Sequence, residues 1–132
     1  MSIAYLDSSA LVKLMVREDE TSALEVDLVD RDGLVTSSLA MVECRRAAGR
    51  ARNRRVLQRV SEVLDAVYLL DLTAPILEAA AGLRPAPVRS LDAIHIATAL
   101  SVGDADLEVI TYDERMAEAV RANGLHVAQP GR

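Results

Sequence analysis

The stretch RSLDAIHIATAL, residues 89–100, predicts a helix that is apolar on almost every side. Leucine, isoleucine and alanine fill most of its positions, and a helix of this kind is normally buried in a protein core. Asp92 and His95 interrupt the pattern three residues apart, so they share one face of the helix. With Ser90 as the N-cap, Asp92 would lie in the first turn, where the helix dipole favours a negative charge. A purely structural role for Asp92 therefore remains open at this point.

Short apolar runs of strand length alternate with helical patterns along the rest of the chain. We expect strands at 2–6, 34–37, 67–72, 107–111 and 125–129, and helices at 9–16, 19–30, 38–53, 54–66, 74–83, 89–100 and 114–123. This order predicts an α/β fold, a three-layer α/β/α sandwich with a mainly parallel central sheet of four to five strands. The length of 132 residues fits a single domain, 1–132.

Composition narrows the compartment in which the chain is expected to work. Hydrophobic residues make up 51% of the sequence, which is typical of a folded globule. The lone Cys44 cannot form an internal disulfide, which suits a reducing compartment. No signal peptide and no apolar run of membrane-spanning length is evident. We therefore expect a cytoplasmic protein with no membrane partner.

The charges are distributed unevenly. The net charge is −5, yet seven arginines and no acid lie between residues 45 and 59. Six of them are candidate RNA contacts through phosphate groups: Arg45, Arg46, Arg50, Arg52, Arg54 and Arg55. A solvated helix face or a protein-binding surface explains the same pattern, and all three interpretations remain open.

Four acidic residues fall at the ends of expected strands or the starts of expected helices: Asp7, Glu43, Asp92 and Asp113. In an open parallel sheet, sites form beyond the carboxyl ends of the strands, so these carboxylates are expected to converge. Converging carboxylates repel one another and either take up protons or bind cations. Oxygen ligands suit Mg²⁺ or Mn²⁺, whereas the chain lacks the Cys and His clusters of zinc sites.

Each acid also has a structural explanation when it is taken alone. Asp7 could cap the helix that follows it, and Asp113 could cap the last helix. Glu43 could pair with Arg46 three residues later. The shared position of the four acids at one sheet edge favours the metal interpretation.

Four blocks, YLDSSALVKL, SSLAMVE, RSLDAIHIATAL and VITYDERM, resemble in order and spacing the motifs of the PIN-domain family. They are most similar to its VapC branch, the ribonuclease toxins of bacterial type II toxin–antitoxin pairs. The resemblance runs from Ile3 to about Gly124, nearly the whole chain.

This resemblance implies a PIN-like fold and an endoribonuclease that cleaves RNA phosphodiesters with water activated by one or two Mg²⁺ or Mn²⁺ ions. The family's catalytic and metal-binding acids correspond to Asp7, Glu43, Asp92 and Asp113. The hydroxyls that orient them correspond to Ser9 and Thr111. The resemblance also implies a homodimer, a small cognate antitoxin as partner, and contact with operator DNA only through that antitoxin.

Four further residues receive less specific expectations. Tyr112 is the one aromatic ring near the expected site and could stack on a base. Glu114 is a candidate for an extra ligand. His95 is tempting as a general base, although a histidine in an apolar helix is more often a packed, hydrogen-bonded core residue. His126 has no argument for a role.

Two other functions remain open. The chain could be a catalytically silent PIN module that binds its antitoxin and operator DNA. It could also be a Mg²⁺-dependent phosphoryl-transfer or receiver-like protein. The second class needs a lysine late in the chain, and the only lysine here is Lys13.

Overall fold

The computed structural model of the protein describes residues 2–132, which form five strands and seven helices. In chain order they are β1 (Ile3–Leu6), α1 (Ser8–Met15), α2 (Thr21–Val29), β2 (Gly33–Ser37), α3 (Leu39–Ala51), α4 (Arg54–Asp65), β3 (Tyr68–Leu70), α5 (Ala74–Ala81), α6 (Ser90–Ser101), β4 (Glu108–Ile110), α7 (Glu114–Ala122) and β5 (His126–Ala128). Every element expected from the sequence is present, with ends that differ by at most two residues.

The five strands form one sheet in the order β3-β2-β1-β4-β5, and all neighbouring pairs are parallel. The expected parallel sheet is therefore confirmed. The chain winds outward from β1 to β3 and then returns to the other side of β1 for β4. That reversal makes the carboxyl ends of β1 and β4 a topological switch point, the usual place for a site in such sheets. Leu6 pairs with Ile110 there, so the residues that follow these two strands emerge side by side.

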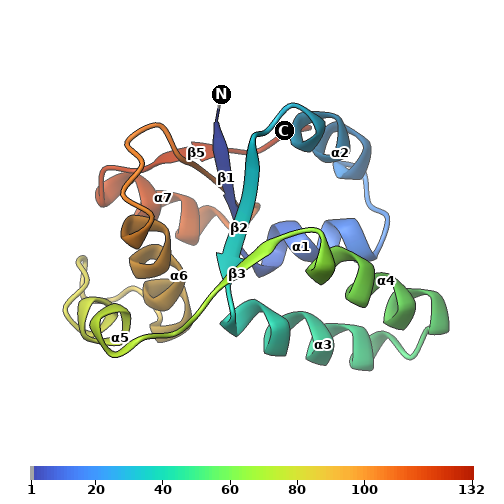
Figure 1. Ribbon diagram of the computed structural model, residues 1–132, viewed down its shortest axis with the longest axis horizontal. Helices are drawn as coiled ribbons and strands as arrows, with labels where there is room; N and C mark the ends of the chain where they lie inside the picture. Colours follow the sequence, from blue (N-terminus) through green and yellow to red (C-terminus); the bar gives the residue numbers. More distant parts are fainter. Residues whose placement is uncertain (1) are drawn as a thin grey trace.

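Helices cover both faces of the sheet, as expected for a three-layer sandwich (Figure 1). The helices α1 to α4 lie on one side and α5 to α7 on the other. The alternation along β1 explains how one short strand serves both layers. Ala4 and Leu6 belong to the core under α1, α3 and α4, whereas Tyr5 belongs to the core under α6 and α7.

The helix quoted above, α6, differs from expectation in two respects. Its N-cap is Arg89 rather than Ser90, and no side chain caps it. Its middle is buried as expected, but Leu91 and Leu100 near its ends are 49% and 41% exposed. Periodicity alone could not show where its neighbours stop covering it. Across residues 2–132, none of the helices combines the length and apolar character needed to span a membrane.

Candidate active site

Asp7 directly follows β1 and is only 5% exposed. Its Oδ1 accepts hydrogen bonds from the Ala10 backbone at 3.1 Å and from Ser9 Oγ at 2.6 Å, and its Oδ2 accepts one from Thr111 Oγ1 at 2.5 Å. Asp7 is thus the N-cap of α1, so its structural role is real. Burial raises the pKa of Asp7 above its ordinary value despite these donors.

Ser9 and Thr111 connect the ends of β1 and β4. While donating to Asp7, Ser9 Oγ also accepts from the Tyr112 backbone at 2.9 Å, and Thr111 Oγ1 accepts from the Asp113 backbone at 3.2 Å. Two small hydroxyls therefore fix the Asp7 carboxylate and the loop that carries Asp113. This placement agrees with the orienting role that the resemblance implied for them.

Glu43 lies on α3 with a side chain that is 22% exposed. Its Oε1 accepts hydrogen bonds from Ser8 Oγ and, at 2.7 Å, from His95 Nε2. Among residues 2–132 no ion pair joins Glu43 to Arg46, so that structural explanation fails. Burial acts to raise the pKa of Glu43, but the bonds from His95 and Ser8 outweigh it and leave the pKa lowered.

Asp92 is half-buried in the first turn of α6. Among residues 2–132, its carboxylate accepts no hydrogen bond and forms no ion pair. Burial raises the pKa of Asp92, and the negative charges of Asp113 and Asp7 raise it further. A carboxylate kept in this place without a protein donor is what a cation site requires.

Asp113 is the N-cap of α7, and its Oδ1 accepts hydrogen bonds from the Arg115 and Met116 backbones at 2.9 and 3.3 Å. Glu114 points elsewhere, since its Oε1 accepts a bond from Gln129 Nε2 at 3.1 Å. The structure therefore gives no support to Glu114 as an extra ligand.

The four acids, which we call the acid cluster, do not surround one common metal position. In the part of the chain that the structure describes, no three His, Cys, Asp or Glu side chains stand close enough to hold a metal ion. The negative charges of Asp7 and Asp113 nevertheless act on Asp92, and Glu43 is hydrogen-bonded to His95, which lies three residues after Asp92 on α6. A divalent cation would offset both the repulsion between these charges and the free-energy cost of burying them. The donor set, all carboxylate oxygen, fits Mg²⁺ or Mn²⁺.

Sequence reasoning missed two features of this cluster. Ser8, next to Asp7, donates to Glu43 across 35 positions of sequence. His95 is packed and hydrogen-bonded, as expected of a core histidine, but its bond to Glu43 was not foreseen. The signal for His95 was its three-residue spacing from Asp92. Nothing in the sequence pattern pointed to Glu43 as its partner.

The arginine face, which we define as Arg45, Arg46, Arg50, Arg52, Arg54 and Arg55, is exposed along α3, the turn that follows it and α4. Arg46 and Arg50 follow Glu43 by three and seven residues, so they lie on the same side of α3. Arg46, Gly49, Arg50 and Arg52 line a shallow hollow of about 500 Å³. The arginine face thus begins next to Glu43 and extends along α3 away from the acid cluster.

Tyr112 is placed differently from the expectation of a base-stacking ring. It is 7% exposed, and its hydroxyl donates to the Pro130 carbonyl at 2.8 Å. Lys13 Nζ and the Arg132 guanidinium lie 4.8 and 5.4 Å from its ring centre. Little of the ring is left for a base, so the structure does not support base stacking by Tyr112.

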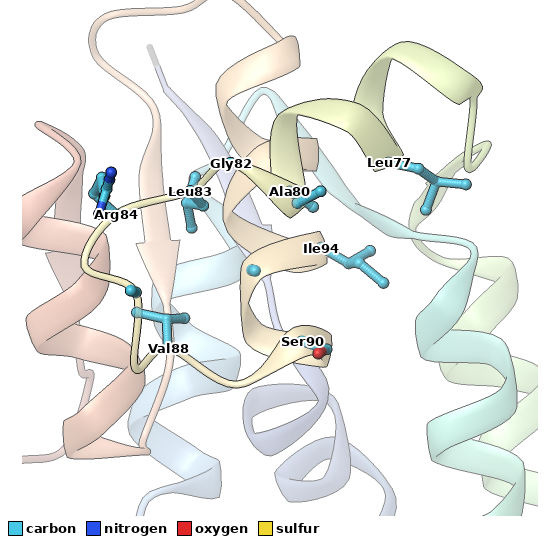
Figure 2. A pocket seen from close by; sticks show the side chains of 11 residues that line it. Leu77, Ala80, Gly82, Leu83, Arg84, Val88, Ser90 and Ile94 are labelled. Atoms are coloured by element: carbon cyan, nitrogen blue, oxygen red, sulfur yellow. The ribbon is translucent and has the colours of Figure 1, made fainter.

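A separate groove of about 590 Å³ lies between α5, the loop after it and α6 (Figure 2). Leu77, Leu83 and Ile94 contribute apolar side chains to its lining, and Arg84 and Ser90 contribute polar ones. None of the four acids lines it. The groove is therefore distinct from the candidate active site.

Comparison with known proteins identifies the family of the chain. The sequence model of the PIN domain matches residues 4–122. This chain belongs to the PIN domain family. The resemblance carried by its four motif blocks is thereby confirmed, and the two short segments outside the match are the first three residues and the C-terminal ten.

The curated relatives of this PIN domain match it over nearly their whole length. Ribonuclease VapC46 of Mycobacterium tuberculosis is 40% identical over 136 residues, which cover 98% of this chain and 99% of the relative. Ribonuclease VapC35 of the same species is 42% identical over 132 residues, covering 97% of each.

Solved structures share the PIN fold at lower sequence identity. VapC20 of Mycobacterium tuberculosis, described as a sarcin-ricin loop cleaving toxin, superposes with a TM-score of 0.75 at 16% identity, covering 96% of this chain and 99% of that one. A toxin-antitoxin complex from Klebsiella pneumoniae gives 0.74 at 21% identity, covering 96% and 97%. These likenesses support the fold.

Proposed function

We propose that this chain is a divalent-metal-dependent endoribonuclease that acts as the toxin of a toxin–antitoxin pair. One observation carries the proposal: Asp92 is a half-buried carboxylate that has no hydrogen-bond or ion-pair partner among residues 2–132 and lies near the charges of Asp113 and Asp7. It lies in a chain whose full-length relatives are VapC ribonucleases.

The cofactor is Mg²⁺ or Mn²⁺, one or two ions, held by Asp7, Glu43, Asp92 and Asp113. When bound, such an ion lowers the pKa of water and neutralises charge on a phosphodiester. Ser9 and Thr111 keep the Asp7 carboxylate oriented, and the two cap bonds fix Oδ1 of Asp113. No side chain of the cluster is required as a nucleophile.

We propose that the arginine face contacts the phosphate groups of the RNA. Its guanidinium groups are exposed, and on α3 they begin about one helical turn from Glu43. A single strand whose scissile phosphate lies at the acids could therefore place neighbouring phosphates against Arg46 and Arg50. Such contacts supply affinity without reading sequence.

The partners follow from the same family membership. A cognate antitoxin is proposed because similar folds occur in toxin–antitoxin complexes. A homodimer, operator DNA bound through the antitoxin, and a cytoplasmic location near cellular RNA complete the proposal.

The test is RNA cleavage by the chain purified without antitoxin, assayed with Mg²⁺, with Mn²⁺ and with EDTA. We expect cleavage with either metal and none with EDTA, and we expect Asp7→Asn and Asp92→Asn to be inactive while remaining folded. Cleavage by both variants at the wild-type rate would overturn the site assignment.

The silent PIN module is the second candidate. It predicts that the chain binds antitoxin while Mn²⁺ neither binds nor supports cleavage. The receiver-like alternative loses support in the structure, because Lys13 is buried and its ammonium lies 2.9 Å from Glu20 Oε1. That lysine is thus already engaged by a carboxylate outside the cluster.

A further inference from the structure

His95 has hydrogen bonds at both ring nitrogens. It lies on α6 with 2% of its surface exposed. Its Nδ1 is 2.6 Å from the Tyr5 hydroxyl, and its Nε2 is 2.7 Å from Glu43 Oε1. The imidazole therefore bridges β1 and α3, two elements that flank the acid cluster.

The chemistry of Glu43 assigns the direction of these bonds. A carboxylate oxygen can only accept a hydrogen bond, so Nε2 donates its proton to Glu43 Oε1. In the neutral imidazole the other ring nitrogen carries no proton and is an acceptor. Nδ1 therefore accepts from the hydroxyl of Tyr5, which is completely buried.

The same chain of bonds fixes one oxygen of Glu43 and not the other. Ser8 Oγ and His95 Nε2 both donate to Oε1. Among residues 2–132, no hydrogen bond or ion pair is recorded for Oε2. Holding a carboxylate by one oxygen orients the second, which is then the oxygen available to a ligand.

We propose that His95, oriented by Tyr5, is a positioning residue that holds Glu43 Oε1 and thereby presents Oε2 to the metal ion. The inference rests on the metal site proposed above. It gives His95 a role other than general base, because a buried imidazole with both nitrogens engaged has none left for water. Partners that orient a ligating carboxylate are typically worth 10–100-fold in metal affinity.

The experiment is a calorimetric titration of Mn²⁺ into the full chain and its variants. His95→Leu should weaken Mn²⁺ binding by about 10–100-fold. His95→Gln, whose amide can still donate to Glu43, should recover most of that loss. Ile96→Val, on the same helix and fully buried, loosens the packing without touching the polar chain, and should leave the affinity unchanged.

A double-mutant cycle with Glu43→Gln tests whether His95 acts through Glu43. In that background His95→Leu should cause no further loss of affinity. Equal Mn²⁺ affinity of the wild type and a folded His95→Leu variant would overturn the positioning role alone. A wild-type chain that binds no Mn²⁺ would overturn the proposed function, and this inference with it.

Nitrogen NMR of the His95 ring provides a readout that needs neither metal nor activity. We expect a protonated Nε2 in the wild type. In Tyr5→Phe, Nδ1 loses its partner while Glu43 still accepts from Nε2, so we expect the same tautomer with a smaller loss of Mn²⁺ affinity than in His95→Leu. An unprotonated Nε2 in the wild type would contradict the proposal, including in the case where His95→Leu does not fold.

Discussion

Asp92 is a residue that the fold keeps at the expense of stability. Burial and two neighbouring negative charges raise its pKa, so its ionised form is less favourable in the folded chain than in the unfolded chain. Asp7 and Asp113 differ, since each also caps a helix. A substitution at Asp92 therefore measures the destabilisation caused by the acid cluster without also removing a helix cap.

Replacing Asp92 with Asn should stabilise the metal-free protein and abolish RNA cleavage. The amide removes the repulsion from Asp113 and Asp7 while keeping the side-chain volume. Thermal unfolding in EDTA should show a higher midpoint for the variant. As a control, Asp30→Asn changes an exposed acid outside the cluster and should leave activity intact.

The pH dependence of stability should carry the same signature. Between the ordinary value of 3.8 and its raised pKa, Asp92 binds more protons in the folded chain than in the unfolded chain. Its contribution to the free energy of unfolding therefore falls as pH rises through that window. In metal-free denaturant titrations, the advantage of Asp92→Asn over wild type should grow with pH; an advantage that shrinks would contradict the raised pKa.

At the scale of elements, the segment after β5 holds the loop between β4 and α7. Gln129 Nε2 donates to the Thr111 carbonyl at 2.9 Å, and Arg132 Nη1 donates to the Tyr112 carbonyl at 3.0 Å. Arg132 also pairs with Glu20, and together with Lys13 it lowers the pKa of Glu20 to about 2. The end of the chain thus braces the loop that delivers Asp113.

Arg132→Ala should lower stability by about 1 kcal/mol, a modest figure because the side chain is partly exposed. It should also weaken Mn²⁺ binding several-fold, because the loop carrying Thr111 and Asp113 loses a brace. Arg17→Ala, which removes another exposed pair at 3.1 Å from Glu25, is the matched control and should leave Mn²⁺ affinity unchanged. Identical Mn²⁺ affinities for both variants would show that the brace does not reach the site.

The elements could be predicted from the sequence because their signals are local. Apolar periodicity predicted the helices α4 and α7. The positions of Asp7 and Asp113 just after strands predicted that these acids belong to a site. The partners of those acids could not be predicted. The bond between Tyr5 and His95 spans 90 positions and depends on how α6 packs on β1, which a pattern within one segment does not contain. The buried position of Tyr112 depends in the same way on the distant Pro130.

On the scale of the whole molecule, the charge is polarised. The arginine face lies on α3 and α4, within a chain of net charge −5. The acid cluster and the arginine face meet on α3, where Glu43 precedes Arg46. Under the proposed function, a nucleic acid would thus be attracted by the arginine face and cut at the acid cluster beside it.

Replacing Arg50, Arg52 and Arg54 with Gln should weaken RNA binding and flatten its dependence on salt. Three lost phosphate contacts to a single strand reduce the slope of log affinity against log salt by about 2. The control replaces Arg17, Arg84 and Arg121, which are exposed elsewhere and change the net charge equally. Equal slopes for the two triple variants would instead assign the arginine face to a protein partner.

If Asp7, Glu43, Asp92 and Asp113 hold one divalent-metal site and this site cuts RNA, metal occupancy and cleavage must rise together. The most direct measurement follows Mn²⁺ occupancy and RNA cleavage in the same sample as Mn²⁺ is titrated into metal-free protein. We expect the cleavage rate to rise in proportion to occupancy, and we expect Asp92→Asn to lose Mn²⁺ occupancy along with cleavage. Cleavage at zero occupancy, or full occupancy of the wild type without cleavage, would contradict this expectation.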